Sequence, residues 1–276
     1  MLRVPVLTYH AVNIAGNDYA NNDHVAFAAD LRLIDDLGLR IVPLHWVVDA
    51  VLGTTQRDLS RCVALSCDDG SDFDFHDLDH PAHGPQRSLY NGMLDFIAER
   101  GAAAQPSLHL TSFVIASPQA RMQLDQRCLA ARGWMNEDWW PQATASGLMA
   151  IECHSWEHNH PALGETGGNG IPRGSFSSVD SPARAEHEIA QAMAYLAGRT
   201  GKQAVTQFAF PFGQSNAFLV NDYLPGRGAE LGLTAAWSTD GRAVAPTDDR
   251  WKLPRHVCGW HWKSPDELRA ILESAA

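Results

Sequence analysis

The sequence of 276 residues predicts an α/β fold built on a mainly parallel sheet. Short apolar runs of strand length alternate along the chain with segments that have helical spacing. The length suits one barrel-sized unit, and a hydrophobic content of 45% is enough to bury a full core. No low-complexity tract divides the chain, so we expect a single domain over residues 1–276.

Seven apolar runs have the length and composition of buried strands. They lie at residues 4–8, 62–67, 110–116, 149–153, 207–210, 234–238 and 252–257. Strands that are covered on both faces, as in a parallel sheet with helices around it, appear as continuous apolar runs of this kind. The spacing between the runs leaves room for crossover helices.

Apolar residues with helical spacing lie between these runs. Two sets are each followed by a glycine that would end the helix: Phe27, Leu31 and Ile34, then Ile189, Met193 and Leu196. The clearest helix is the last, because Ser264 is a good N-cap, Pro265 suits the first helical position and Glu267 supplies a capping-box acid. We expect it to bury Leu268, Ile271 and Leu272.

Two stretches, residues 71–87 and 158–180, have the composition of loop insertions. The second is rich in Gly and Ser; the first holds a set of potential ligands, namely Asp72, Asp74, His76, Asp77, Asp79, His80 and His83. A second metal site is one interpretation of this set. A solvated acidic loop is favoured, since the spacing specifies no coordination geometry. Long loops beside strand ends often shape a substrate pocket, so both are candidates for specificity.

Charge and hydropathy exclude several classes of protein. A net charge of −11 with 21 Lys and Arg argues against a nucleic-acid partner or an anionic membrane surface. No run approaches eighteen apolar residues, so membrane insertion is not expected. The N-terminus enters the first predicted strand without a signal-like apolar region, which predicts a cytoplasmic location. The oligomeric state is left open.

The five cysteines are odd in number and include no Cys-x-x-Cys pair, which indicates free thiols. Cys67 and Cys153 directly precede the acidic and histidine segments described next. Alternation along a strand sends neighbouring side chains to opposite faces, so these two are interpreted as small buried residues and not as metal ligands.

Two segments together carry the groups of a hydrolytic metal centre. Asp68 and Asp69 follow one buried run, and His154 and His158 follow another. Two histidines four residues apart can bind one metal, and a site with three protein ligands leaves a position open for water. The carboxyl ends of parallel strands meet on one face, where active sites collect. We therefore assign Asp69, His154 and His158 as ligands, which leaves Asp68 as a spare carboxylate.

At these segments the chain resembles the NodB-like polysaccharide deacetylases (carbohydrate esterase family 4). The resemblance rests on Asp-Asp-Gly at 68–70, His-Ser-Trp-Glu-His at 154–158 and Phe-Ala-Phe-Pro-Phe-Gly at 208–213, in the family's order. Residues 4–10, 109–115 and 253–255 are also similar to the family's pattern. It implies a distorted (β/α)7 barrel and a metal-dependent hydrolase that removes N-acetyl groups from an amino sugar or an N-acetylated glycan, releasing acetate.

The resemblance also implies roles for individual residues. Asp68 would be the general base, acting beside one divalent metal, most simply zinc, with cobalt or nickel as alternatives. The backbone N–H of Phe212 would stabilise the oxyanion. Pro211 and Gly213 suit a tight turn that presents this donor and contacts the substrate.

The chain departs from the family pattern in two places. Ala209 stands where many relatives have an arginine, and Arg255 is the candidate to orient Asp68 instead; the alternative is an ordinary salt bridge at a strand end. The closing motif with a catalytic histidine is not recognisable. His10, His256 and His261 are available in its place; His10 is interpreted as a substrate-binding residue, and no general acid is assigned.

Substrate identity is not specified by the sequence. The resemblance suggests an N-acetylated sugar such as N-acetylglucosamine, and aromatic stacking surfaces could come from Trp134, Trp139, Trp140, Trp156, Trp260 and Trp262. A related amidohydrolase acting on a small amide or ureide is one alternative. A non-catalytic carbohydrate-binding barrel is another, although the intact acids and histidines count against it.

Overall fold

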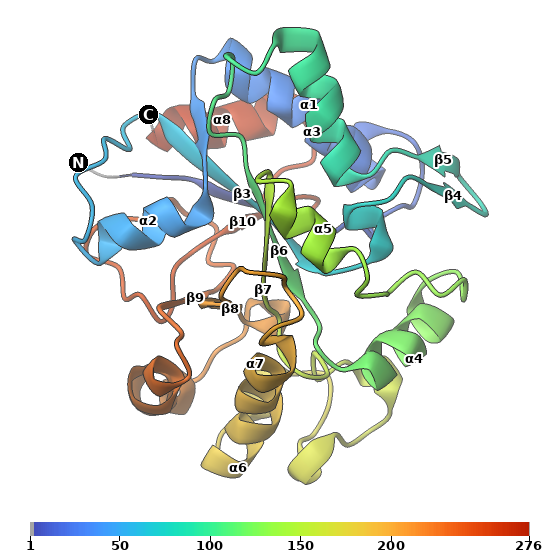
Figure 1. The fold of residues 1–276 in the computed structure, drawn as a ribbon, viewed down its shortest axis with the longest axis vertical. Coiled ribbons are helices and arrows are strands. Elements are labelled where there is room, and N and C mark those ends of the chain that lie inside the picture. Colours follow the sequence, from blue (N-terminus) through green and yellow to red (C-terminus); the bar gives the residue numbers. More distant parts are fainter. Residues whose placement is uncertain (1–2, 276) are drawn as a thin grey trace.

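The computed structural model describes residues 3–275, in which a curved parallel sheet is surrounded by helices (Figure 1). Its strands run in the order β10-β1-β3-β6-β7-β8-β9, and β2 pairs with β3. They are β1 (Val6–Tyr9), β2 (Arg40–Val42), β3 (Cys62–Asp69), β6 (Leu110–Val114), β7 (Met149–Cys153), β8 (Gln207–Ala209), β9 (Ala235–Trp237) and β10 (His256–Val257). Each predicted run overlaps one strand on the main path of this sheet. The predicted distorted barrel is confirmed.

Three strands were not predicted from the sequence. β2 is short and begins at an exposed arginine, so it lacks the continuous apolar run of the others. β4 (Leu78–His80) and β5 (Gly84–Gln86) form a separate antiparallel hairpin within the first predicted insertion. None of the three has a completely buried length, which explains why apolar runs did not reveal them.

The helices surround the sheet, with α1, α3 and α8 grouped on one side of it (Figure 1). The α-helices are α1 (Asp23–Asp36), α2 (Leu44–Val51), α3 (Leu89–Arg100), α4 (Pro118–Cys128), α5 (Trp140–Ala145), α6 (Pro182–Ala185), α7 (Gln191–Leu196) and α8 (Pro265–Ala275). Two π-helical segments are η6 (Glu186–Ala190) and η8 (Leu219–Gly228). Short 3₁₀ turns are η1 (Tyr19–Asn21), η2 (Asp72–Asp74), η3 (Pro161–Leu163), η4 (Gly168–Gly170), η5 (Phe176–Ser178) and η7 (Pro211–Gly213). No helix within residues 3–275 is long and apolar enough to cross a membrane.

The three predicted helices correspond to α1, the continuous η6–α7 segment and α8. At the start of α8 the Ser264 hydroxyl accepts a hydrogen bond from the Glu267 N–H at 3.3 Å, as expected of an N-cap. The Glu267 carboxylate bonds the N–H of Lys263, one residue before the predicted partner. Leu268 and Leu272 are buried as predicted, whereas Ile271 is half-buried against the core.

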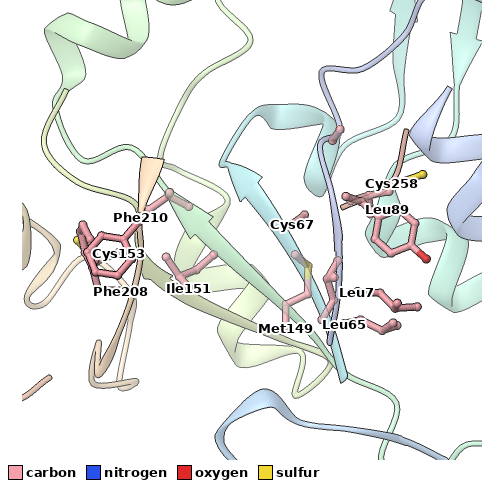
Figure 2. Close-up of a cluster of buried hydrophobic side chains, with 14 of the residues drawn as sticks. Leu7, Leu65, Cys67, Leu89, Met149, Ile151, Cys153, Phe208, Phe210 and Cys258 are labelled. Carbon is pink, nitrogen blue, oxygen red and sulfur yellow. The ribbon is translucent and has the colours of Figure 1, made fainter. Parts of the chain in front are cut away.

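Alternation along the strands divides the side chains between two cores. On the outer side of the sheet Leu65, Ile151 and Phe208 join the large cluster under the helices, together with Cys67 and Cys153 (Figure 2). On the inner side a second cluster includes Val6, Ala64, Phe113, Ala209 and Trp237. Asp68, near the carboxyl end of β3, continues the inner set and meets Arg255, which directly precedes β10. All five cysteines are free thiols.

The prediction of a solvated loop at residues 71–87 is wrong for its first turn. Asp74 is completely buried and accepts hydrogen bonds from the Ser112 hydroxyl at 2.6 Å and from the Cys67 thiol at 3.3 Å. Burial raises the pKa of Asp74 to about 7. Asp72 is also buried and accepts from the backbone and side chain of Asn136. These acids are structural groups beneath the loop.

Candidate active site

The end of β3 places two adjacent carboxylates in one cavity. Strand alternation would send Asp68 and Asp69 to opposite sides of the sheet. The chain avoids this because Asp69 has φ of 77° and Gly70 has φ of 74°, which turns the backbone at the strand end. A Cβ on Gly70 would lie 2.5 Å from Val114 Cγ1 and 2.9 Å from its Cα, so only glycine fits here. Both acids therefore line the same cavity.

The end of β7 brings two histidines to Asp69. The segment turns through Ser155 and His158, with φ of 69° and 59°, and the His158 N–H donates to the Ser155 hydroxyl at 2.8 Å. As a result, Asp69 Oδ1 lies 3.7 Å from His154 Nε2 and 3.5 Å from His158 Nε2. These three residues form a compact group of potential metal ligands.

The chemistry of this donor group fits a divalent metal. The Nδ1 of His154 lies 2.9 Å from the Ala209 carbonyl oxygen, so Nδ1 carries the proton and Nε2 offers its lone pair. Burial lowers the pKa of both His154 and His158, which favours the neutral, metal-binding form of each ring. One oxygen and two nitrogen donors suit zinc, cobalt or nickel.

The purified protein should carry about one divalent transition metal per chain, because three donors converge at one point. Metal content, measured by elemental analysis, should fall to background when Asp69, His154 and His158 are all changed to alanine. The matched control is His160→Ala: this residue lines the same cavity but lies outside the ligand group. Metal that survives the triple change would remove the assignment, and loss of metal in His160→Ala would identify His160 as a ligand instead.

The Asp68 carboxylate is paired with Arg255 in a fully buried, bidentate interaction. Arg255 Nη1 lies 2.7 Å from Asp68 Oδ1, and Nη2 lies 2.8 Å from Oδ2. The guanidinium also donates to the Ser66 hydroxyl and the Ser238 carbonyl, and its side chain is 0% exposed. Burial by itself would raise the pKa of Asp68, but the charge and hydrogen bonds of Arg255 outweigh it and hold that pKa well below its usual range. The carboxylate is thus kept ionised in a fixed orientation.

The turn at 211–213 lies beside the second histidine. Phe212 has φ of 58°, and its ring centroid lies 4.5 Å from that of His158. Gly213 is required, because a Cβ there would lie 1.9 Å from Thr239 Oγ1. Within residues 3–275 the Phe212 N–H has no backbone partner. Gly213 lines the cavity, whereas Pro211 is buried behind it and does not.

The cavity around these groups has a volume of about 610 Å³. Of the three histidines left open by the sequence, His10 lines it; His256 and His261 do not, and their rings lie 5.8 Å apart. The backbone N–H of His10 donates to the Asp23 carboxylate at 2.7 Å. This bond fixes the end of β1 against the start of α1.

Several residues of the cavity were not identified from the sequence. The polar ones are Asn13, His160, Gln214 and Thr239, and the apolar ones are Val12, Ile115, Leu124, Cys128, Leu129, Met135 and Val257. His160, two residues beyond a ligand, could have been found from its position. The apolar residues of the cavity had no comparable feature in the sequence that would have identified them. Among the tryptophans considered for stacking, Trp260 lines the cavity and is 67% exposed, while Trp139, Trp140 and Trp262 are core residues.

A buried ionic network supports the histidine segment from behind. Glu188 is completely buried; its carboxylate accepts from the Glu157 N–H at 3.0 Å, and its backbone carbonyl accepts from the Trp156 N–H at 2.8 Å. The Glu157 carboxylate pairs with Arg173 at 2.6 Å and lies 3.9 Å from His187. The network therefore ties η6 and the loop at 158–180 to the backbone between the two candidate histidine ligands.

Comparisons with known proteins agree with this geometry. The sequence model of the family described as polysaccharide deacetylase matches residues 55–235, about two thirds of the chain, and no curated protein matches. Among solved structures, the deacetylase PplD of Streptococcus pyogenes in complex with acetate has a TM-score of 0.64 at 17% identity, covering 98% of each chain.

Two further solved structures have the same fold. IcaB from Ammonifex degensii has a TM-score of 0.63 at 18% identity, covering 99% of this chain and 97% of the other. A de-N-acetylase from Aggregatibacter actinomycetemcomitans has a TM-score of 0.64 at 15% identity, covering 98% and 100%. Given the match of the family model, the chain belongs to the polysaccharide deacetylase family, whose members are hydrolases acting on carbon–nitrogen bonds other than peptide bonds.

Proposed function

We propose that this protein hydrolyses the N-acetyl amide of an amino sugar or an N-acetylated glycoconjugate, using one bound divalent metal, with zinc as the resident ion. The observation that carries this proposal is the placement of Asp69, His154 and His158 beside an arginine-paired Asp68 in one cavity. When bound, a divalent metal polarises an amide carbonyl and lowers the pKa of water, which makes a nucleophile available near neutral pH.

Asp68 is the proposed general base. Its Oδ2 lies 4.0 Å from His154 Nε2, so the carboxylate stands next to the ligand group without belonging to it. Since Arg255 keeps this carboxylate ionised, it is ready to accept the proton of the attacking water. Different roles for the two adjacent acids are supported by their orientations, because Asp69 turns toward the histidines and Asp68 toward Arg255.

The Phe212 N–H is the proposed donor to the tetrahedral oxyanion. It belongs to the turn that packs on His158, and no backbone partner within residues 3–275 occupies it. The left-handed conformation of Phe212 and the close approach of Gly213 to Thr239 make this turn rigid. A donor fixed in advance stabilises developing charge with little reorganisation.

His10 is the proposed proton donor to the leaving amine, since it alone of the three open histidines lines the cavity. His10→Gln should lower kcat by about 10²-fold with normal metal content, the usual scale for a lost acid. The matched control is His261→Gln, because His261 lies outside the cavity lining. Steady-state kinetics and elemental analysis test this; a normal kcat in His10→Gln would exclude the role.

Acetate release tests the proposed function directly. Purified enzyme is assayed for acetate release from N-acetylglucosamine glycosides, short chitooligosaccharides and simple acetamides, and for loss of the substrate itself with ureides, with Asp68→Asn as the blank. The proposal is supported if the natural enzyme releases acetate from the sugar substrates and Asp68→Asn does not. Turnover of an amide or ureide alone would indicate the related amidohydrolase, and sugar binding without turnover would indicate a carbohydrate-binding barrel.

A further inference from the structure

One wall of the catalytic cavity is apolar over a continuous stretch of chain. It begins at Ile115, just after β6, and continues through Leu124 of α4 to Leu129 and Met135 in the segment that follows. Apart from the thiol of Cys128, this wall offers no polar side chain to the cavity. The polar side chains Asn13, Gln214 and Thr239 come from other parts of the chain.

The apolar wall leads into a second cavity of about 240 Å³. The two cavities share Val12, Cys128 and Leu129, so they adjoin at these side chains. The second cavity is completed by Ile14, Phe73, His80, Pro81, Ala130 and Trp134, among which His80 is the sole ionisable side chain. We call the apolar wall of the first cavity and this second cavity together the apolar groove.

Aromatic packing gives the far end of the groove a fixed shape. Phe73 is buried, and its ring meets that of Trp134 edge to face, with centroids 5.1 Å apart. The Asp72 N–H donates to the Trp134 carbonyl at 2.9 Å, which joins the segment after α4 to the loop after β3. The groove is therefore built from elements that also carry the catalytic acids.

The lining of the groove selects against the hydroxyl-bearing edge of a sugar chain. A hydroxyl placed against the aliphatic side chains there would lose hydrogen bonds to water, and the side chains that could replace one are confined to His80, Trp134 and Cys128. An alkyl or aryl group would instead exchange contact with water for contact with Leu129, Ile14 and Trp134. The groove thus fits an apolar substituent.

We propose that the apolar groove binds an apolar aglycone, so that the preferred substrate is an amphiphilic glycoside of an N-acetylated amino sugar. This inference rests on the proposed function. The family removes an acetyl group, which has a single methyl to bury, whereas the second cavity alone has a volume of about 240 Å³. The apolar group must therefore belong to the amine side of the amide, which is the sugar and its aglycone.

The test compares kcat/KM for acetate release from the methyl and hexyl glycosides of N-acetylglucosamine. Each methylene that becomes buried should increase kcat/KM by roughly fourfold. With three or more methylenes in the groove, the hexyl-to-methyl ratio should exceed roughly tenfold. Contributions from the amide and the sugar ring cancel in this ratio, since both groups are the same in the two compounds.

Two variants test whether the gain arises in the groove. Leu129→Asn and Ile14→Asn place an amide on different segments of its lining and should each reduce the hexyl-to-methyl ratio toward one. Leu129→Met is the matched control, because it preserves size and apolar character and should keep the ratio. Thermal unfolding and metal content of each variant establish that it is folded and loaded.

Several outcomes would overturn the inference. Equal rates on both glycosides, or a ratio retained in both asparagine variants, would show that the groove does not bind the aglycone. A larger gain from a chitooligosaccharide would make the groove a sugar subsite, and faster release of hexanoate than acetate would assign it to the acyl group. In each of these cases deacylation persists and the proposed function stands; no release from any sugar would overturn both.

Discussion

Asp68→Asn should leave the metal content near normal and lower kcat by about 10²-fold or more, the usual scale for a lost general base. Asparagine keeps the shape of the side chain but cannot accept the proton of the attacking water. The metal should remain because Asp68 lies outside the group formed by Asp69, His154 and His158. Single-turnover kinetics combined with elemental analysis separates the two effects.

The matched control is Asp74→Asn. Asp74 is a buried acid in the turn that follows β3, but its raised pKa of about 7 leaves it only partly ionised near neutral pH, and it accepts a hydrogen bond from Ser112 on the outer side of the sheet. An amide should replace a protonated acid there with little effect on kcat. If Asp68→Asn lost metal and activity together, Asp68 would be a ligand; if it kept normal activity, the base would lie elsewhere.

Arg255→Met should destabilise the fold and shift the pH dependence of catalysis. Removing one member of a buried bidentate pair leaves Asp68 without its partner, at a cost of about 3–5 kcal/mol in the free energy of unfolding. Loss of the positive charge raises the pKa of Asp68, so the base protonates at a higher pH than before. The acidic limb of the kcat/KM profile should therefore move upward.

The stability change should depend on pH in a definite direction. In the natural protein the depressed pKa of Asp68 contributes stability above the ordinary aspartate pKa, and this contribution is lost as the pH falls through the folded-state value. In Arg255→Met the same carboxylate opposes folding whenever it is ionised. The difference in unfolding free energy between the two proteins should thus be largest near neutral pH and shrink in acid, as urea titrations at several pH values would show.

Arg255→Lys provides the control for charge alone. It keeps a cation near Asp68 but cannot form two parallel hydrogen bonds, so it should recover part of the stability and part of the pH shift. A downward movement of the acidic limb in Arg255→Met would contradict the electrostatic explanation. If the acidic limb of the kcat/KM profile and the free energy of unfolding were both unchanged in Arg255→Met, the pair of Asp68 and Arg255 would be of little energetic importance.

The features that the sequence predicted well are those encoded locally. The strands at 62–67 and 149–153 are continuous apolar runs, and the residues that follow each run supply the acids and the histidines within a few positions. Such patterns need no knowledge of the rest of the chain. The ligand group could therefore be assigned before any geometry was available.

The features that escaped prediction depend on contacts between distant segments. Arg255 and Asp68 are separated by 187 positions, so their pairing could be proposed but its buried, bidentate form could not. The helix α4 is polar over most of its length, and it places Leu124 and Cys128 on the cavity side. Nothing in its local pattern indicates that it lines a catalytic cavity.

The pairing of Asp68 with Arg255 also sets an order for events during synthesis of the chain. All three proposed metal ligands lie at or before position 158, so they leave the ribosome long before β10 and the arginine that precedes it. Until β10 adds beside β1, the base has no guanidinium to orient it. His154 in turn waits for the Ala209 carbonyl of β8, so the site would be completed from the later part of the chain, and hydrolysis would begin only after the last strand of the sheet is in place.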